Sequence, residues 1–165
     1  MKQYGFTLVE VLVSMMIFSV IMLVSVSSFV YALDLQRRAF NLQQAEENAN
    51  FILESITKEL RVSAITSPLA DSCPVATLVI QHPDHGEVEY SLVGTDIHRK
   101  VGETDTIMNS NTVKFSRFDF CVAGATTKDS RQPRVMIRLS LTTTNTNRQA
   151  SVDLQTTLSL RELSN

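Results

Sequence analysis

The sequence lacks the short motifs that mark several common enzyme classes. It contains no glycine-rich phosphate-binding loop, no G-x-G-x-x-G dinucleotide motif and no G-x-S-x-G nucleophile elbow. It also lacks an excess of positive charge, since 15 Lys and Arg residues stand against 17 Asp and Glu residues, for a formal net charge of −2. Domains that bind nucleic acid usually carry a basic patch. These absences predict a protein that is not an enzyme, and they argue against a nucleic-acid partner.

Charge is absent altogether from Val11 to Leu33, and Glu10 is the only carboxylate between Phe6 and Leu33. Neither glycine nor proline follows Gly5 in this run, so no residue in it breaks a helix. About 20 apolar residues in a helix suffice to cross the hydrocarbon core of a bilayer. The sequence therefore predicts a single transmembrane helix over residues 6–33.

Glu10 lies close to the start of this apolar run, behind a short segment in which Lys2 is the only basic residue. A carboxylate inside a bilayer costs several kcal/mol, so it is a candidate functional residue. A secretory signal would carry its small-residue cleavage site after the apolar region, whereas Gly5 stands before it. The alternative is a plain signal anchor whose acid lies near the lipid headgroups.

The residues Gly5-Phe6-Thr7-Leu8-Val9-Glu10 resemble the N-terminal signal of type IV pilins and type II secretion pseudopilins. In that family a prepilin peptidase cuts after the glycine and methylates the new N-terminal phenylalanine. The resemblance implies that residues 1–5 are a cleaved leader, that Phe6 is methylated and that the apolar helix is retained. It also implies that Glu10 pairs with the free amine of a neighbouring subunit. The implied partners are other pilin-type subunits, the prepilin peptidase, an inner-membrane assembly platform and membrane lipid.

Residues 34–66 are predicted to continue the helix as an amphipathic half. Apolar residues recur there at steps of three and four and predict one buried stripe: Leu35, Ala39, Leu42, Ala45, Ala49, Ile52, Leu53, Ile56 and Leu60. The other face is polar: Gln36, Arg37, Arg38, Gln43, Gln44, Glu46, Glu47, Lys58 and Glu59. Pro68 ends the helix because it disfavours helical geometry at Ser67.

After this helix the hydrophobic period changes from 3.6 to 2, which predicts strands. These are expected at residues 75–81, 87–93, 96–101 and 112–122, followed by a terminal hairpin at 135–141 and 150–160. A phase slip near Ser116 and Arg117 predicts a β-bulge. One apolar and one polar face indicate an antiparallel sheet that is covered on one side. The predicted fold class is α+β and pilin-like: a long N-terminal helix with a transmembrane half and an amphipathic half, packed on an antiparallel β head over residues 67–165.

The two cysteines, Cys73 and Cys121, both follow the predicted membrane span. If the head lies outside the cytoplasm, they are expected to form a disulfide, which contributes about 4 kcal/mol on the chain-entropy model. Two buried thiols in a reducing compartment are the alternative.

The best candidates for metal ligands lie in one turn and its surroundings. A transition metal would use His82, Asp84 and His85, with His98 as a further ligand. The same residues are explained by a hairpin turn with Pro and Gly. Calcium would use Asp71, Asp84, Glu87 and Glu89, but no D-x-D-x-D-G loop is present. We therefore expect neither a metal nor a cofactor.

The order of elements resembles minor pilins of the PilW type and the J-type minor pseudopilin, which lie at filament tips or prime assembly. The expected function is that of a minor subunit, processed after Gly5 and assembled into, or priming, a type IV pilus or a type II secretion pseudopilus. Before assembly it would sit in the inner membrane with its head outside the cytoplasm. The alternative is a single-span, membrane-anchored binding module that is neither processed nor polymerised.

Overall fold

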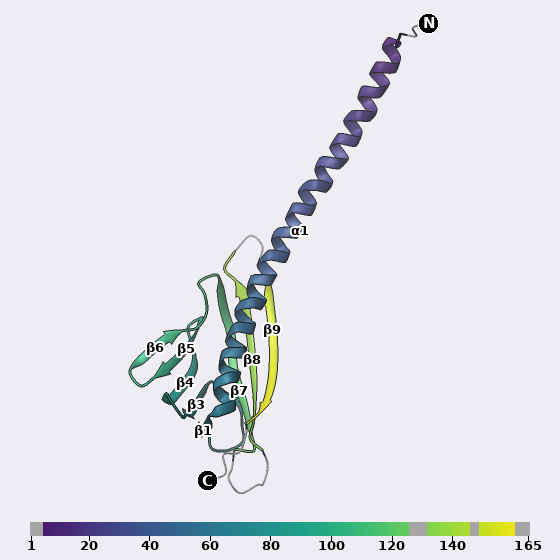
Figure 1. Cartoon of the computed structure of the whole chain (residues 1–165). Coiled ribbons are helices and arrows are strands. Elements are labelled where there is room, and N and C mark those ends of the chain that lie inside the picture. The colour runs from purple at the N-terminus through teal and green to yellow at the C-terminus, as the bar shows by residue number, and fades with distance from the viewer. Residues whose placement is uncertain (1–4, 126–131, 146–148, 161–165) are drawn as a thin grey trace. The chain divides into compact units, whose positions relative to one another are not determined.

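A computed structural model describes residues 5–125, 132–145 and 149–160 of the chain. Residues 1–4 of the predicted leader and 161–165 of the predicted head lie outside this range. Within it, one helix precedes two antiparallel sheets (Figure 1): α1 (Leu8–Val62), β1 (Ala64–Ser67), β2 (Ser72–Val75), β3 (Thr77–His82), β4 (Gly86–Val93), β5 (Asp96–Val101), β6 (Thr104–Ile107), β7 (Val113–Ala123), β8 (Arg134–Thr143) and β9 (Ser151–Ser159). The chain forms two compact units, residues 1–39 and residues 40–165.

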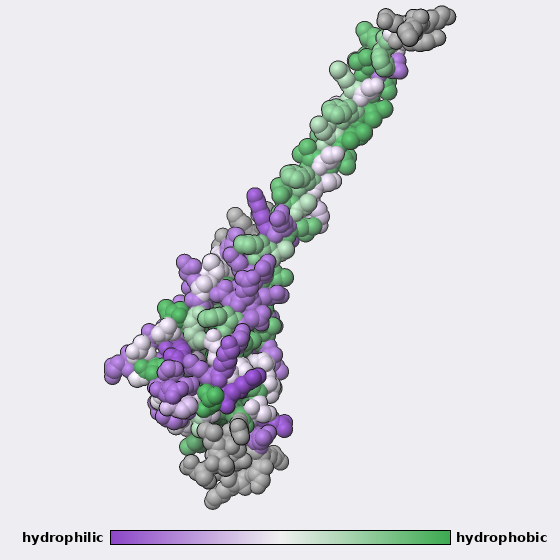
Figure 2. All heavy atoms as spheres, in the orientation of Figure 1, coloured by the Kyte–Doolittle hydropathy of each residue, from purple (hydrophilic) through white to green (hydrophobic). Residues whose placement is uncertain are grey.

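The first unit contains the N-terminal part of α1, in which every described residue from Gly5 to Leu33 is exposed. Figure 2 shows apolar side chains along this part of the helix. Its serine hydroxyls donate to carbonyls four residues back, which satisfies their polar groups without a solvent partner: Ser14, Ser19, Ser25, Ser27 and Ser28. By length and composition, α1 is able to cross a membrane.

The second unit contains the rest of α1, packed on the sheets through one buried stripe: Asn41, Ala45, Ala49, Ile52, Ile56 and Leu60. The predicted stripe is confirmed from Ala45 to Leu60. It is wrong before that point, because Leu35, Ala39 and Leu42 are exposed. Only the helix from Phe40 onward belongs to the same compact unit as the sheets, so burial begins at Asn41.

The helix ends at Val62, four residues before the predicted end at residue 66. Ser63 closes its last turn, with its hydroxyl donating to the carbonyl of Glu59 at 2.6 Å. The next residues form β1, in which Ile65 lies opposite Ile80 of β3. The predicted boundary was too late because β-branched residues such as Ile65 favour a strand when a sheet edge is available to pair with.

The head contains two antiparallel sheets where the sequence predicted one. Their strand orders are β1-β3-β4-β5-β6 and β2-β7-β8-β9. The predicted bulge is confirmed by a register shift between Phe115 and Arg117. Side chains from both sheets and from α1 form one core, whose largest fully buried members include Tyr90, Phe115 and Phe120. Three strands of four residues each, β1, β2 and β6, were not predicted.

Candidate processing and assembly site

The predicted cleavage bond lies outside the helix. Gly5, Phe6 and Thr7 precede α1 without regular structure, and Phe6 is 82% exposed. The space around the Gly5 Cα is open, with no atom near the position that a Cβ would occupy. A peptidase needs an accessible, non-helical segment, and such segments are the usual sites of cleavage. The Gly5–Phe6 bond meets this requirement.

Thr7 determines where the helix begins. Its carbonyl accepts the first helical hydrogen bond from the Val11 N–H at 3.3 Å. Its hydroxyl accepts a second one from the Glu10 N–H, also at 3.3 Å. Thr7 is therefore the N-cap and Glu10 the third helical residue, the spacing of a capping box. The local sequence thus begins α1 two residues after the cleavage bond and leaves that bond free.

The Glu10 carboxylate is exposed in the first turn of α1. The partial positive charge of a helix N-terminus favours a negative side chain at this position. Among the described residues, no cation forms an ion pair with it. Its carboxylate is therefore available to a partner from another chain.

A partly buried ionic cluster joins α1 to the first sheet. Tyr90 of β4 donates its hydroxyl hydrogen to Glu59 of α1. Arg99 of β5 donates to both carboxylate oxygens of Glu59, with an Nη2–Oε1 distance of 2.9 Å. The side chains of Glu59 and Arg99 are 23% and 22% exposed, and Tyr90 is fully buried. The sequence placed Glu59 on the polar face of the helix, and the structure pairs it there with side chains of the first sheet.

The cluster shifts the pKa of each of its members. Burial would raise the pKa of the Glu59 carboxyl, but hydrogen bonds from Tyr90 and Arg99 and the charge of Arg99 outweigh burial and lower it. Burial raises the pKa of Tyr90, and the bond to the Glu59 carboxylate raises it further. Burial lowers the pKa of Arg99, but the contact with Glu59 more than offsets this and leaves it raised. All three groups are thus held in one protonation state, as a structural clamp requires.

The structure joins Cys73 of β2 to Cys121 of β7 in a disulfide, with a Cα–Cα distance of 4.3 Å. The two strands are hydrogen-bonded neighbours in the second sheet. The bridge closes a separation of 48 residues and ties the short strand β2 to a central strand of the head.

The histidine turn forms a local hydrogen-bonded structure. His82 is buried, and its Nδ1 accepts the backbone N–H groups of Asp84 at 3.1 Å and His85 at 3.2 Å. Its ring stacks on that of His85. His98 instead pairs through Nδ1 with Asp105 at 2.9 Å. In the part of the chain that the structure describes, no three His, Cys, Asp or Glu side chains are grouped to hold a metal ion.

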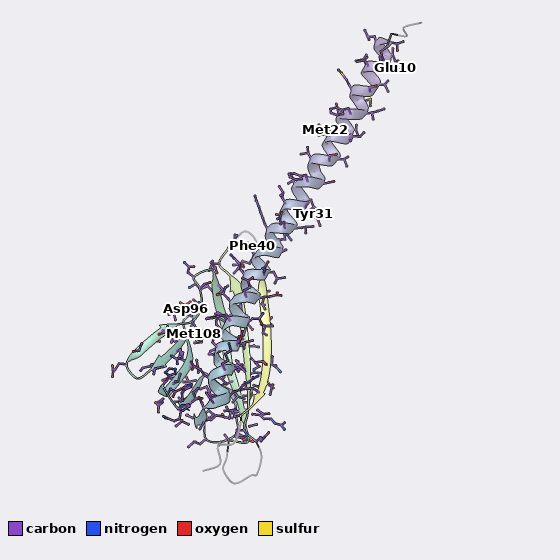
Figure 3. The ribbon with its side chains drawn as sticks, viewed as in Figure 1. Glu10, Met22, Tyr31, Phe40, Asp96 and Met108 are labelled. Carbon is purple, nitrogen blue, oxygen red and sulfur yellow. A yellow bond between two sulfur atoms is a disulfide. The ribbon has the colours of Figure 1, made fainter. Side chains whose placement is uncertain are left out.

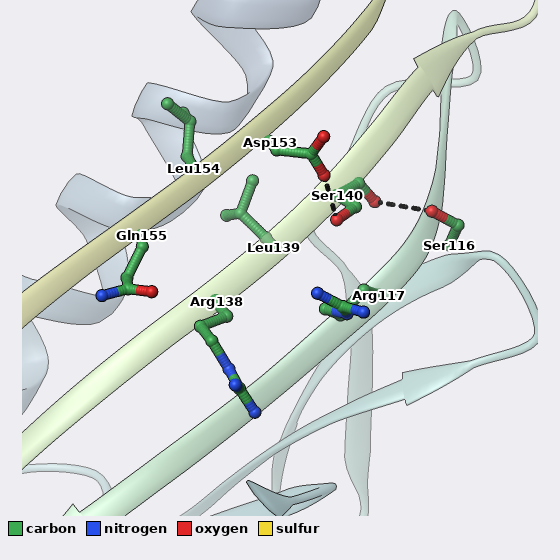
Figure 4. A pocket seen from close by; sticks show the side chains of 8 residues that line it. All are labelled: Ser116, Arg117, Arg138, Leu139, Ser140, Asp153, Leu154 and Gln155. Atoms are coloured by element: carbon green, nitrogen blue, oxygen red, sulfur yellow. Dashed lines mark hydrogen bonds between the residues drawn. The ribbon is translucent and has the colours of Figure 1, made fainter.

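A shallow depression lies on β7, β8 and β9, and Figure 4 shows the side chains that line it. Its polar groups bind one another: the Ser140 hydroxyl donates to Asp153, and the Ser116 hydroxyl donates to the Ser140 carbonyl at 3.4 Å. Arg138 pairs with Asp119 at 2.6 Å. These contacts engage Ser116, Arg138, Ser140 and Asp153 within the hydrogen-bonded surface of the sheet.

Comparison with known proteins bears on the N-terminus alone. Residues 1–26 match the family model described as the prokaryotic N-terminal methylation motif. The matched segment contains Gly5, Phe6 and Glu10. The match supports a relation to type IV pilins and pseudopilins, and with the apolar helix it fits a single-pass, membrane-anchored protein. The search of curated proteins found no match, and neither did the search of solved structures.

Proposed function

We propose that the chain is a structural, non-catalytic subunit of a type IV pilus or a type II secretion pseudopilus. A prepilin peptidase would hydrolyse the Gly5–Phe6 bond and methylate the amine of Phe6. The observation that carries this proposal is the position of that bond, which lies exposed in non-helical chain before the N-cap Thr7. The match to the methylation motif supports the same bond.

Hydrolysis creates an ammonium group on Phe6, two residues before α1 begins. The helix dipole makes this end of α1 electropositive, so a carboxylate partner is needed there. Glu10 of a neighbouring subunit would supply it. Pairing stabilises both charges in a medium of low dielectric constant, where either group alone would be costly. The pair would fix the axial position of one subunit against the next.

We further propose a minor subunit that sits at a filament tip or primes assembly. The order of a long helix, a meander, a phenylalanine-rich strand and a terminal hairpin supports this choice. Before assembly the subunit would be anchored in the inner membrane by the N-terminal part of α1. Its head would lie outside the cytoplasm, where the Cys73–Cys121 bridge is stable.

Mass spectrometry of the N-terminus tests the proposal. Protein purified from membranes should begin at Phe6 and carry one added methyl group. Replacing Gly5 by Leu should leave the chain uncut, whereas Thr7→Ser, which keeps a capping hydroxyl, should be processed normally. An intact Met1, or a cut after Ala32, would instead support the unprocessed binding module or a cleaved signal sequence.

A further inference from the structure

The depression on β7, β8 and β9 has a volume of about 490 Å³ and lies on the face of the second sheet that is turned away from the core (Figure 4). Buried and partly exposed residues alternate along β8, and Arg138 and Ser140 belong to the partly exposed set. The strand register places Arg138 opposite Gln155 of β9 and Ser140 opposite Asp153. The short side chain of Ser140 thus stands among longer ones, and this difference in length accounts for the hollow.

The bulge in β7 adds Arg117 to this outer face. The register shifts between Phe115 and Arg117, which leaves Ser116 as the extra residue and places Arg117 opposite Ser140. Ser116 and Arg117 are consequently both exposed, whereas a regular strand would turn one of the two inward. A β-bulge redirects side chains in this way and is common next to active sites. The bulge therefore supplies the depression with a guanidinium group.

The guanidinium of Arg117 keeps donors that a ligand could use. Among the described residues its ion pair is a long one, to Asp119 at 3.9 Å, and its side chain is 60% exposed. Asp119 is bound more closely by Arg138, at 2.6 Å. Lys114, the preceding cation on β7, pairs instead with Asp96 of the first sheet at 3.4 Å, and Figure 3 labels Asp96. Arg117 is thus the cation of this face that is best placed to bind an added anion.

We propose that the depression binds a saccharide that carries one carboxylate. Arg117 would hold the carboxylate, because a planar guanidinium donates two parallel hydrogen bonds to such a group. The Gln155 amide and the Ser116 hydroxyl can each donate and accept, as sugar hydroxyls require. Apart from Leu139 and Leu154, every described residue that lines the depression is polar, whereas a site for an apolar ligand is lined mainly by hydrophobic and aromatic side chains. The inference goes beyond the proposed function and depends on neither cleavage nor assembly.

Charge favours a ligand with one negative charge over a polyanion. Two cations, Arg117 and Arg138, are balanced by two carboxylates, Asp119 and Asp153, in and beside the depression. A chain of phosphates would bring several negative charges close to these carboxylates, which is unfavourable. A saccharide with one carboxylate brings a single charge to Arg117, and its hydroxyls can donate to Asp153.

Titration of the full-length protein in detergent, labelled with isotopic arginine and followed by nuclear magnetic resonance, tests the proposal. The probe is an aldobiouronic acid, a disaccharide with one uronate, and its methyl ester has the same rings without the charge. The Nε–Hε signal of Arg117, identified by its loss in Arg117→Gln, should shift saturably with the acid. The ester should bind about tenfold more weakly. Arg117→Gln, followed on the Arg138 signal, should also weaken binding of the acid about tenfold or more, the factor expected for a hydrogen bond between charged groups.

The matched control is Arg134→Gln, on the same strand and the same face of the sheet. Arg134 lies four residues before Arg138, about 13 Å along β8, and opposite Ala123 and Ser159. The control removes the same charge but should change the affinity less than about twofold. Ser140→Val fills the floor of the depression, keeps every charge and should weaken binding. Near-UV circular dichroism of each variant verifies that the head is folded.

Several results would overturn the inference. They are the absence of saturable binding, equal affinity for the acid and its ester, equal effects of Arg117→Gln and Arg134→Gln, and normal binding by a folded Ser140→Val variant. Displacement of the saccharide by a lower concentration of a single-stranded oligonucleotide would also overturn it, because this face would then select a polyanion.

Discussion

The clamp between α1 and the first sheet gives a prediction that the structure defines in detail. Replacing Glu59 by Gln keeps the shape of the side chain and its ability to accept a hydrogen bond from Tyr90, but removes the ion pair with Arg99. Hydrogen bonds to charged groups contribute about 1.5–3 kcal/mol each. Because Arg99 is 22% exposed and can recover some hydration, we expect the free energy of unfolding to fall by about 1–3 kcal/mol.

The pH dependence of stability provides a second signature of the clamp. The pKa of Glu59 in the folded chain lies below its ordinary value of 4.5. Its contribution is therefore fully present above the unfolded value and is lost as the pH falls through the folded value. The native chain should lose stability below about pH 4.5 more steeply than the Glu59→Gln variant.

Chemical unfolding of the full chain in detergent, followed by near-UV circular dichroism, measures both effects. The control is Glu54→Gln, five residues earlier on the helix. Its partner Lys58 is 73% exposed, so the change should leave stability unchanged. The pair Glu59→Gln and Tyr90→Phe should be non-additive, since both changes remove parts of one cluster. Equal effects of Glu59→Gln and Glu54→Gln, or full additivity with Tyr90→Phe, would refute the assignment of this cluster as a clamp.

Three further predictions concern other parts of the chain. Replacing both Cys73 and Cys121 by Ser should lower the free energy of unfolding by about 4 kcal/mol, measured by urea unfolding; an unchanged midpoint would contradict this. Replacing Thr7 by Ala should weaken the first turn of α1 by about 1 kcal/mol, seen as faster hydrogen exchange of the Glu10 amide, which loses its acceptor, while Thr7→Ser should not. Glu10→Gln should leave cleavage intact but reduce the subunit in sheared filaments at least about tenfold, which requires a loss of only about 1.4 kcal/mol of pairing; normal incorporation would show that the charge has no role in assembly.

The helix and the main strands were predictable because each repeats its hydrophobic pattern over enough residues. The alternation in β8 and β9 extends over nine or ten residues and marks one face unambiguously. The four-residue strands contain too few residues to display a period. Strand β2 forms by pairing with β7, where Ser72 lies opposite Val122. The local sequence of β2 contains no pattern from which this pairing could be predicted. The division into two sheets follows from such distant pairings and was missed for the same reason.

The N-terminal methylation motif could be recognised from the sequence and the clamp could not, and the difference is one of distance along the chain. Gly5, Phe6 and Glu10 lie within six residues, so their spacing alone identifies the motif. Glu59 lies between buried Ile56 and Leu60, at the edge of the apolar stripe. The helical periodicity alone assigns a charged residue at such a position to the polar face. Its partners follow 31 and 40 residues later, and only the folded meander brings them to the helix.

On the proposed function, Glu59 and Glu10 of the same helix would each be neutralised by a cation, but from different chains. A carboxylate shielded from water needs a cation, and the head supplies Arg99 to Glu59 from its own sheet. Among the described residues no cation pairs with Glu10, and the proposed hydrolysis after Gly5 would supply one from a neighbouring chain. Neutralising Glu59 should then impair folding before assembly, whereas neutralising Glu10 should impair assembly of a chain that folds normally. Hydrogen exchange of the head and filament content, measured on both variants, would show the reverse pattern if this division of roles were wrong.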